Sequence, residues 1–104
     1  MNPHRSLFAL LVLGALVACE PPVVHPVSFY EKAPEKRTAT IDGVKITVVR
    51  QMGNGYVAWG GGKESDQWAQ YKQRRAIELV SGCLVHDVVS KKTDPVYYAF
   101  VQCD

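Results

Sequence analysis

The sequence comprises 104 residues with 12 Lys and Arg, 10 Asp and Glu, and a formal net charge of +2. A chain of this length builds one small domain. Its nearly balanced charge gives no positive field that would draw in nucleic acid, which argues against a nucleic-acid-binding protein.

The first residues have the pattern of an export signal. Arg5 precedes an uncharged apolar run, Leu7–Ala18, which is too short to span a bilayer as a helix. The sequence Leu16-Val17-Ala18-Cys19 resembles the bacterial lipobox at every position. The resemblance implies that residues 1–18 are a lipoprotein signal peptide, and that Cys19 carries a thioether-linked diacylglycerol and an amide-linked acyl chain such as palmitate. The alternatives are an ordinary signal peptide, which leaves Cys19 a plain thiol, and a short uncleaved anchor.

Lipid on Cys19 would attach the protein stably to a membrane. Each buried methylene contributes about 0.8 kcal/mol, and two or three chains hold where a single chain is reversible. The next residue is Glu20. Since an aspartate at this position favours retention in the inner membrane in enterobacterial lipoproteins, the resemblance implies a protein of the bacterial cell envelope, at the periplasmic face of the outer membrane.

Residues 19–37 predict a lipidated tether rather than a folded element. The segment combines charges with prolines, which resist both helices and sheet ladders. We expect it to lift a single folded domain, residues 38–104, off the lipid surface. The prolines are Pro21, Pro22, Pro26 and Pro34, and the charged residues are Glu31, Lys32, Glu35, Lys36 and Arg37.

The folded domain is predicted to start with two or three strands. Thr38–Ile41 and Val44–Arg50 flank Asp42-Gly43, a strong signal for a tight hairpin turn. Glycines at positions 53 and 55 indicate a second turn, which leads into a short strand over Tyr56–Trp59.

A helix is predicted over residues 65–81. Ser65 or Asp66 can accept hydrogen bonds from the first free amides, and Gly82 suits a left-handed C-cap. At 100° per residue the apolar side chains gather on one face, which we expect to pack on the sheet. The residues of this face are Trp68, Ala69, Ala76, Leu79 and Val80.

Two β-rich runs follow the helix and predict a C-terminal hairpin around the loop 91–95. If Ser90 lies opposite Val96, the register also sets Cys83 opposite Cys103. Opposed residues in an antiparallel pair have about the Cα separation that a disulfide needs, so we expect Cys83 and Cys103 to be bonded. The same register pairs Asp87 with Ala99 and Val85 with Val101.

The sequence offers little for catalysis, a cofactor or a metal. Cys83 and His86 suggest a thiol with its base, yet three residues along a strand put them on opposite faces, and a structural disulfide is the better interpretation. The three histidines have no metal-ligand spacing. Gly60–Lys63 lacks the first glycine and the Ser or Thr of a phosphate-binding loop. We therefore expect no cofactor, no metal and no enzymatic activity.

One face of the C-terminal hairpin is the candidate partner surface. Tyr97 and Tyr98 point to opposite faces of the sheet, so one of them lies on the side away from the helix. An exposed aromatic and apolar strip on that side would suit a partner. Its members are His86, Val88, Tyr98 and Phe100.

Together these elements predict an α+β fold in ββ(β)αββ order: a small antiparallel sheet, one helix packed on it and a disulfide-closed hairpin. The leading functional hypothesis is a membrane-anchored envelope lipoprotein, a non-enzymatic binding or structural module for an envelope protein or a cell-wall component. Trp59–Lys63, with Tyr56 before it, resembles the Trp-x-x-Gly region of lipoprotein lysozyme inhibitors. That resemblance implies a disulfide-bonded all-β barrel and an inhibitor function, and a small periplasmic enzyme is the third hypothesis.

Overall fold

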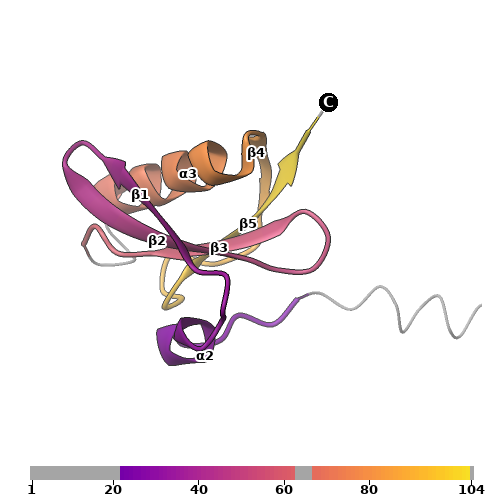
Figure 1. Cartoon of the computed structure of the whole chain (residues 1–104). Helices are drawn as coiled ribbons and strands as arrows, with labels where there is room; N and C mark the ends of the chain where they lie inside the picture. Colours follow the sequence, from indigo (N-terminus) through magenta and orange to yellow (C-terminus); the bar gives the residue numbers. More distant parts are fainter. Residues whose placement is uncertain (1–21, 63–66, 104) are drawn as a thin grey trace, which may run out of the picture.

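The computed structural model describes residues 22–62 and 67–103. The predicted signal peptide, Cys19 and the predicted cap residues Ser65 and Asp66 lie outside these ranges. No helix within the two ranges is long and apolar enough to cross a membrane. The elements, in chain order, are α2 Val27–Glu31, β1 Arg37–Ile41, β2 Val44–Arg50, β3 Gly55–Trp59, α3 Gln67–Ser81, β4 Leu84–Val88 and β5 Tyr97–Gln102 (Figure 1).

The strands form one antiparallel sheet in the order β1-β2-β3-β5-β4. The predicted turn between β1 and β2 is confirmed: Asp42 and Gly43 both have positive φ, as a two-residue hairpin turn requires. Where β3 meets β5, Gly55 lies opposite Phe100, and a Cβ on Gly55 would stand 3.1 Å from the Phe100 ring. The sheet is open, with β1 and β4 at its edges, and so differs from the closed barrel that the inhibitor resemblance implied.

Helix α3 covers one face of the sheet, as predicted, but it is rotated from the expected orientation. Its buried side chains are Ala69, Gln73, Ala76 and Ile77, whereas Trp68 and Leu79 are exposed. The two alanines let the helix approach the strands closely, and the Gln73 amide fits beneath the helix because its Nε2 donates to the Gly60 carbonyl at 2.8 Å. The predicted contacts of Trp68 and Leu79 with the sheet were therefore wrong. The sheet contributes to this core Ile41, Ile46, Val48, Ala58, Tyr97, Ala99 and Val101.

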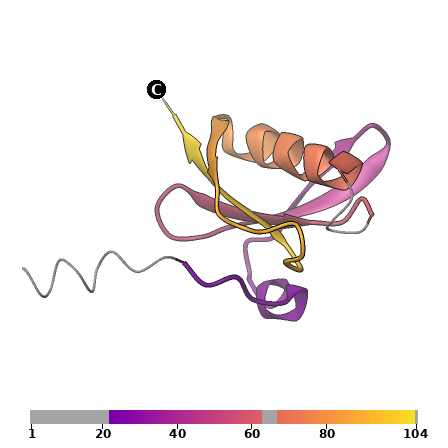
Figure 2. The same cartoon turned by 180° about the vertical axis from the view of Figure 1, so that it is seen from behind.

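Helix α2 covers the opposite face, where the sequence predicted a free tether (Figures 1 and 2). Tyr30 is 2% exposed and packs among residues of β2, β3 and the start of β5. The physical reason is that the central strands are apolar on both faces: Val48 and Val49 are consecutive and both buried. A sheet that is apolar on both faces needs a layer on each, and the proline-rich segment supplies the second. The buried residues around Tyr30 are Val49, Val57, Val96 and Tyr98.

The disulfide between Cys83 and Cys103 is confirmed, with a Cα–Cα distance of 4.9 Å. It closes the β4–β5 hairpin, in which Val85 lies opposite Val101 as predicted. Beyond this pair the register shifts by one residue at His86, an irregularity typical of a β-bulge. Asp87 consequently lies opposite Phe100 instead of Ala99.

Candidate functional site

The predicted partner strip on the hairpin does not form one surface. Tyr98 is 7% exposed and packs beneath α2 beside Tyr30, and Phe100 is partly buried on the same face. The bulge at exposed His86 sets Val88 opposite Ala99, which belongs to the core on the α3 face. Since opposed residues share a face, Val88 lies on the other side of the sheet from Tyr98. The strip was wrong for two reasons: α2 covers Tyr98 and Phe100, and the bulge moves Val88 to the other face of the sheet.

The shifted register instead contributes to a groove between α3 and the edge strand β4. The groove is shallow and open to solvent, and its volume is about 350 Å³. Helix α3 packs mainly on β1, β2 and β3, so β4 is left exposed along most of its length. At one end the helix and strand are joined by the Val85 N–H, which donates to Glu78 Oε2 at 3.0 Å. Away from that link the α3–β4 groove is lined by Gln67, Gln70, Tyr71, Arg74, Val88 and Tyr97.

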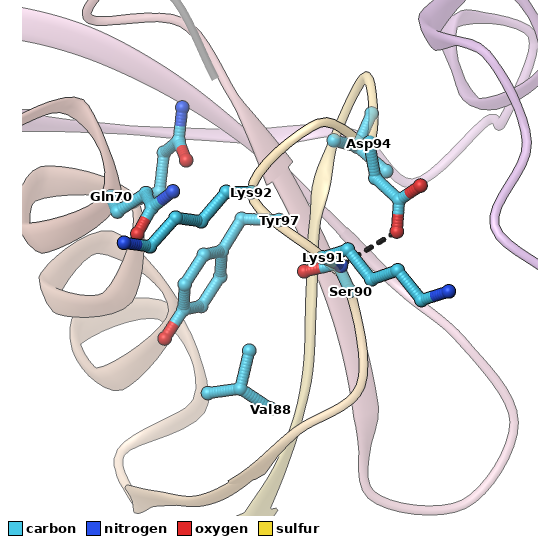
Figure 3. Close-up of a pocket in the computed structure, with 9 residues that line it drawn as sticks. Gln70, Val88, Ser90, Lys91, Lys92, Asp94 and Tyr97 are labelled. Carbon is cyan, nitrogen blue, oxygen red and sulfur yellow. Dashed lines mark hydrogen bonds between the residues drawn. The ribbon is translucent and has the colours of Figure 1, made fainter. Parts of the chain in front are cut away.

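A smaller pocket of about 50 Å³ adjoins the groove under the 91–95 loop (Figure 3). The two hollows share Gln70, Val88 and Tyr97. In Figure 3 the Lys92 side chain extends from the loop toward Gln70 on α3, and the Tyr97 hydroxyl points away from it, in the direction of Val88. Helix, edge strand and loop therefore border one continuous recess, which we call the α3–β4 recess. Its loop-side residues are Gln73, Ser90, Lys91, Lys92, Asp94 and Val96.

Tyr97 forms the floor of the recess. Its side chain is 9% exposed, and its hydroxyl makes no hydrogen bond to the residues that the structure describes. Burial raises the pKa of the Tyr97 hydroxyl above its usual value; the charge of nearby Arg74 lowers it and that of Glu78 raises it. The phenol therefore stays protonated at neutral pH and offers an O–H donor to whatever occupies the recess.

The charged side chains around the recess are mostly cations. Arg74, Lys91 and Lys92 form no ion pair with the described residues, whereas the neighbouring Arg75 pairs with Glu78 at 2.8 Å. The acidic residue of the loop is Asp94, whose Oδ2 already accepts the backbone N–H of Lys91 at 2.7 Å. The recess thus combines a positive rim with hydrogen-bond donors.

These groups can hold a ligand through hydrogen bonds and charge. Tyr97 offers an O–H donor, and the three cations are N–H donors that have no accepting lone pair while charged. Cys83 is tied in the disulfide, so it cannot be the nucleophile weighed from the sequence. Among residues 22–62 and 67–103, no group of three His, Cys, Asp or Glu side chains could bind a metal ion.

Sequence reasoning did not identify the residues of this recess. Tyr97 was considered only for the face of the sheet to which it points, and no role was assigned to Gln70 or Arg74. The recess depends on the rotation of α3 and on the bulge in β4, neither of which a periodicity reveals. The one available signal was the pair Lys91-Lys92 in a loop that leads into an aromatic strand.

A second hollow of about 210 Å³ lies near the other end of α3. Arg37, Arg50 and Tyr56 line it together with Glu35, whose carboxylate opposes the two guanidinium groups. It therefore makes a weaker anion site than the α3–β4 recess.

Comparisons with protein-family models, with curated proteins and with solved structures find no match to this chain.

Proposed function

We propose that the protein is a lipid-anchored envelope lipoprotein whose folded domain binds, without catalysis, an anionic group of another envelope component. The lipid anchor is supported by the lipobox Leu16–Cys19. The binding role is supported above all by one observation: the protonated Tyr97 hydroxyl lies in a recess that is bordered by the unpaired cations Arg74 and Lys92. A carboxylate or phosphate in the recess would accept hydrogen bonds from such donors.

The size of the recess supports a small group rather than a large interface. A volume of about 350 Å³ lies at the lower end of the range of small-molecule sites. It accommodates one or two amino-acid residues or a single sugar. A peptide terminus or an acidic sugar of a cell-wall component fits that description, and so does the acidic segment of an envelope protein.

The binding proposal is tested with a defined carboxylate. Acetyl-Ala-Ala with a free carboxyl terminus is titrated into isotope-labelled mature protein, and the backbone amide resonances are followed by NMR. The expected result is a set of shifts in Gln70, Arg74 and Lys92, absent with the C-terminally amidated peptide. Inorganic phosphate is titrated separately to distinguish a phosphate site from a carboxylate site.

Two neighbouring arginines give a matched pair of variants. Arg74→Gln should weaken peptide binding about 10- to 100-fold, since hydrogen bonds to charged groups contribute about 1.5–3 kcal/mol. Arg75→Gln, one residue away and paired with Glu78, should leave the affinity unchanged. Equal losses in both variants, or no shifts with peptide or phosphate, would refute the proposed site.

The anchor is tested independently of the recess. Cells fed labelled palmitate should incorporate label into the wild-type protein and none into Cys19→Ser. Persistent labelling of that variant would show that Cys19 is not the attachment site.

A further inference from the structure

The segment between the lipid site and the sheet is held against the domain. Val24 and Val27 pack into the cluster around Tyr30, and the His25 N–H donates to the Tyr30 hydroxyl at 3.0 Å. With Tyr30 buried, residues 24–30 are fixed to the sheet face opposite α3. The position of the lipid is therefore coupled to one face of the domain.

The chain that remains between this fixed segment and the lipid is short. Cys19 precedes Val24, the first fixed residue, by five residues. Five extended residues reach at most about 18 Å. A lipid on Cys19 would hold Val24 within that distance of the lipid headgroups.

The outer surface of α2 and the residues before it carries apolar side chains. Val23 is 67% exposed and Phe29 is 54% exposed. The Phe29 ring stacks on His25, with ring centroids 4.0 Å apart and an interplanar angle of 20°. Because the stacking fixes the ring on the outside of the helix, little side-chain freedom is lost when it meets a partner.

The charges around these side chains nearly cancel. Lys32 and Lys36 are exposed, and so are Glu31 and Glu35. Electrostatic attraction to anionic lipid is therefore weak, and contact with a membrane would depend on the apolar residues. An aromatic ring and an aliphatic side chain beside an acyl anchor suit the boundary between headgroups and acyl chains.

We propose that residues 22–31 form a membrane-contact face: in the lipidated protein Val23 and Phe29 insert into the headgroup region, and α3 faces away from the bilayer. The inference rests on the proposed lipid at Cys19. It deepens the proposed function, because a protein docked in this way presents the α3–β4 recess to the periplasm and not to its own membrane.

The experiment uses the lipidated full-length mature protein in phosphatidylethanolamine–phosphatidylcholine vesicles. An environment-sensitive nitrobenzoxadiazole label is attached at Ser28→Cys, an exposed position beside Phe29, or at Thr93→Cys, an exposed position in the loop at the recess. The expected result is that a nitroxide on shallow acyl carbons quenches the label at 28 and leaves the label at 93 unquenched. Added salt should not change this pattern.

Matched variants test whether the apolar side chains make the contact. Phe29→Ser with Val23→Ser should reduce the quenching at position 28 at least threefold. Leu79→Ser removes an exposed apolar side chain from α3 and should leave the quenching unchanged. Circular dichroism confirms that each variant is folded.

The outcomes separate this inference from the proposed function. In one outcome the acylated protein is found in the vesicle fraction while its label at position 28 is quenched only by a water-soluble quencher. With this outcome the lipoprotein proposal stands, and the membrane-contact face is refuted. Energy transfer between labels at position 28 without vesicles would identify a second copy as the occupant and also overturn it. Mass spectrometry that finds no acyl chains on Cys19 overturns both.

Discussion

Tyr30→Ala tests whether α2 is an integral layer of the fold. The residue is 2% exposed and is surrounded by Val49, Val57, Val96 and Tyr98. Replacing a buried aromatic residue with alanine costs about 3–5 kcal/mol. The lost hydrogen bond from the His25 N–H, at 3.0 Å, adds to this by about 0.5–1.5 kcal/mol.

The structure also limits the loss of unfolding free energy in Tyr30→Ala. If α2 detaches in the variant, the cost cannot exceed the free energy with which it docks, and a five-residue helix docks largely through Tyr30. We therefore expect a loss of about 3 kcal/mol, the lower end of the range. For a domain of this size, that lowers the melting midpoint by about 12–24 °C.

The assay is urea unfolding followed by fluorescence, for which Trp59 is well placed because its ring centroid lies 6.3 Å from that of Tyr30. The matched control is Phe29→Ala, one residue away and 54% exposed, which should cost less than about 1 kcal/mol. If both variants unfold at the same urea concentration as the wild type, α2 is a tether after all and the second layer does not stabilise the domain.

Two further predictions concern the disulfide and the tyrosines. Cys103→Ala should destabilise the domain by roughly 3 kcal/mol, since the bond to Cys83 closes a loop with a sequence separation of 20; an unchanged urea midpoint would contradict this. Burial raises the pKa of both Tyr97 and Tyr98, so the folded state favours the protonated phenols. Their contribution to stability is complete below the unfolded pKa of about 10 and is lost as the pH rises through the folded values. The free energy of unfolding should therefore fall above pH 10, and it should fall less steeply with pH in Tyr97→Phe than in the wild type. Equal slopes in the two proteins would refute the contribution of Tyr97.

Local patterns in the sequence predicted the elements whose structure depends on near neighbours. Asp42-Gly43 defines its turn through the positive φ of both residues, and the cysteines at 83 and 103 fit one hairpin. Residues 67–81 are helical where capping and composition indicated. Each of these features depends on contacts within one element or between strands that follow one another.

The features that sequence reasoning missed depend on packing between distant segments. The helical period allowed Trp68 and Leu79 on the buried face. In the structure, however, α3 is rotated about its axis so that Gln73 faces the sheet and donates to the Gly60 carbonyl, and Trp68 and Leu79 are exposed. Nothing near His86 marks a bulge, since no glycine or proline interrupts the strand. For α2, the useful signal was the pair Val48-Val49, because consecutive buried residues in a strand require cover on both faces.

The place of β5 in the sheet has a consequence for the order in which the protein can fold. β5 is synthesised after every other strand, yet it lies between β3 and β4. Until Tyr97–Gln102 has emerged, β3 lacks one neighbour, β4 lacks its only one, and the clusters on both faces lack their β5 residues. A growing chain therefore cannot complete its core until β5 has been synthesised.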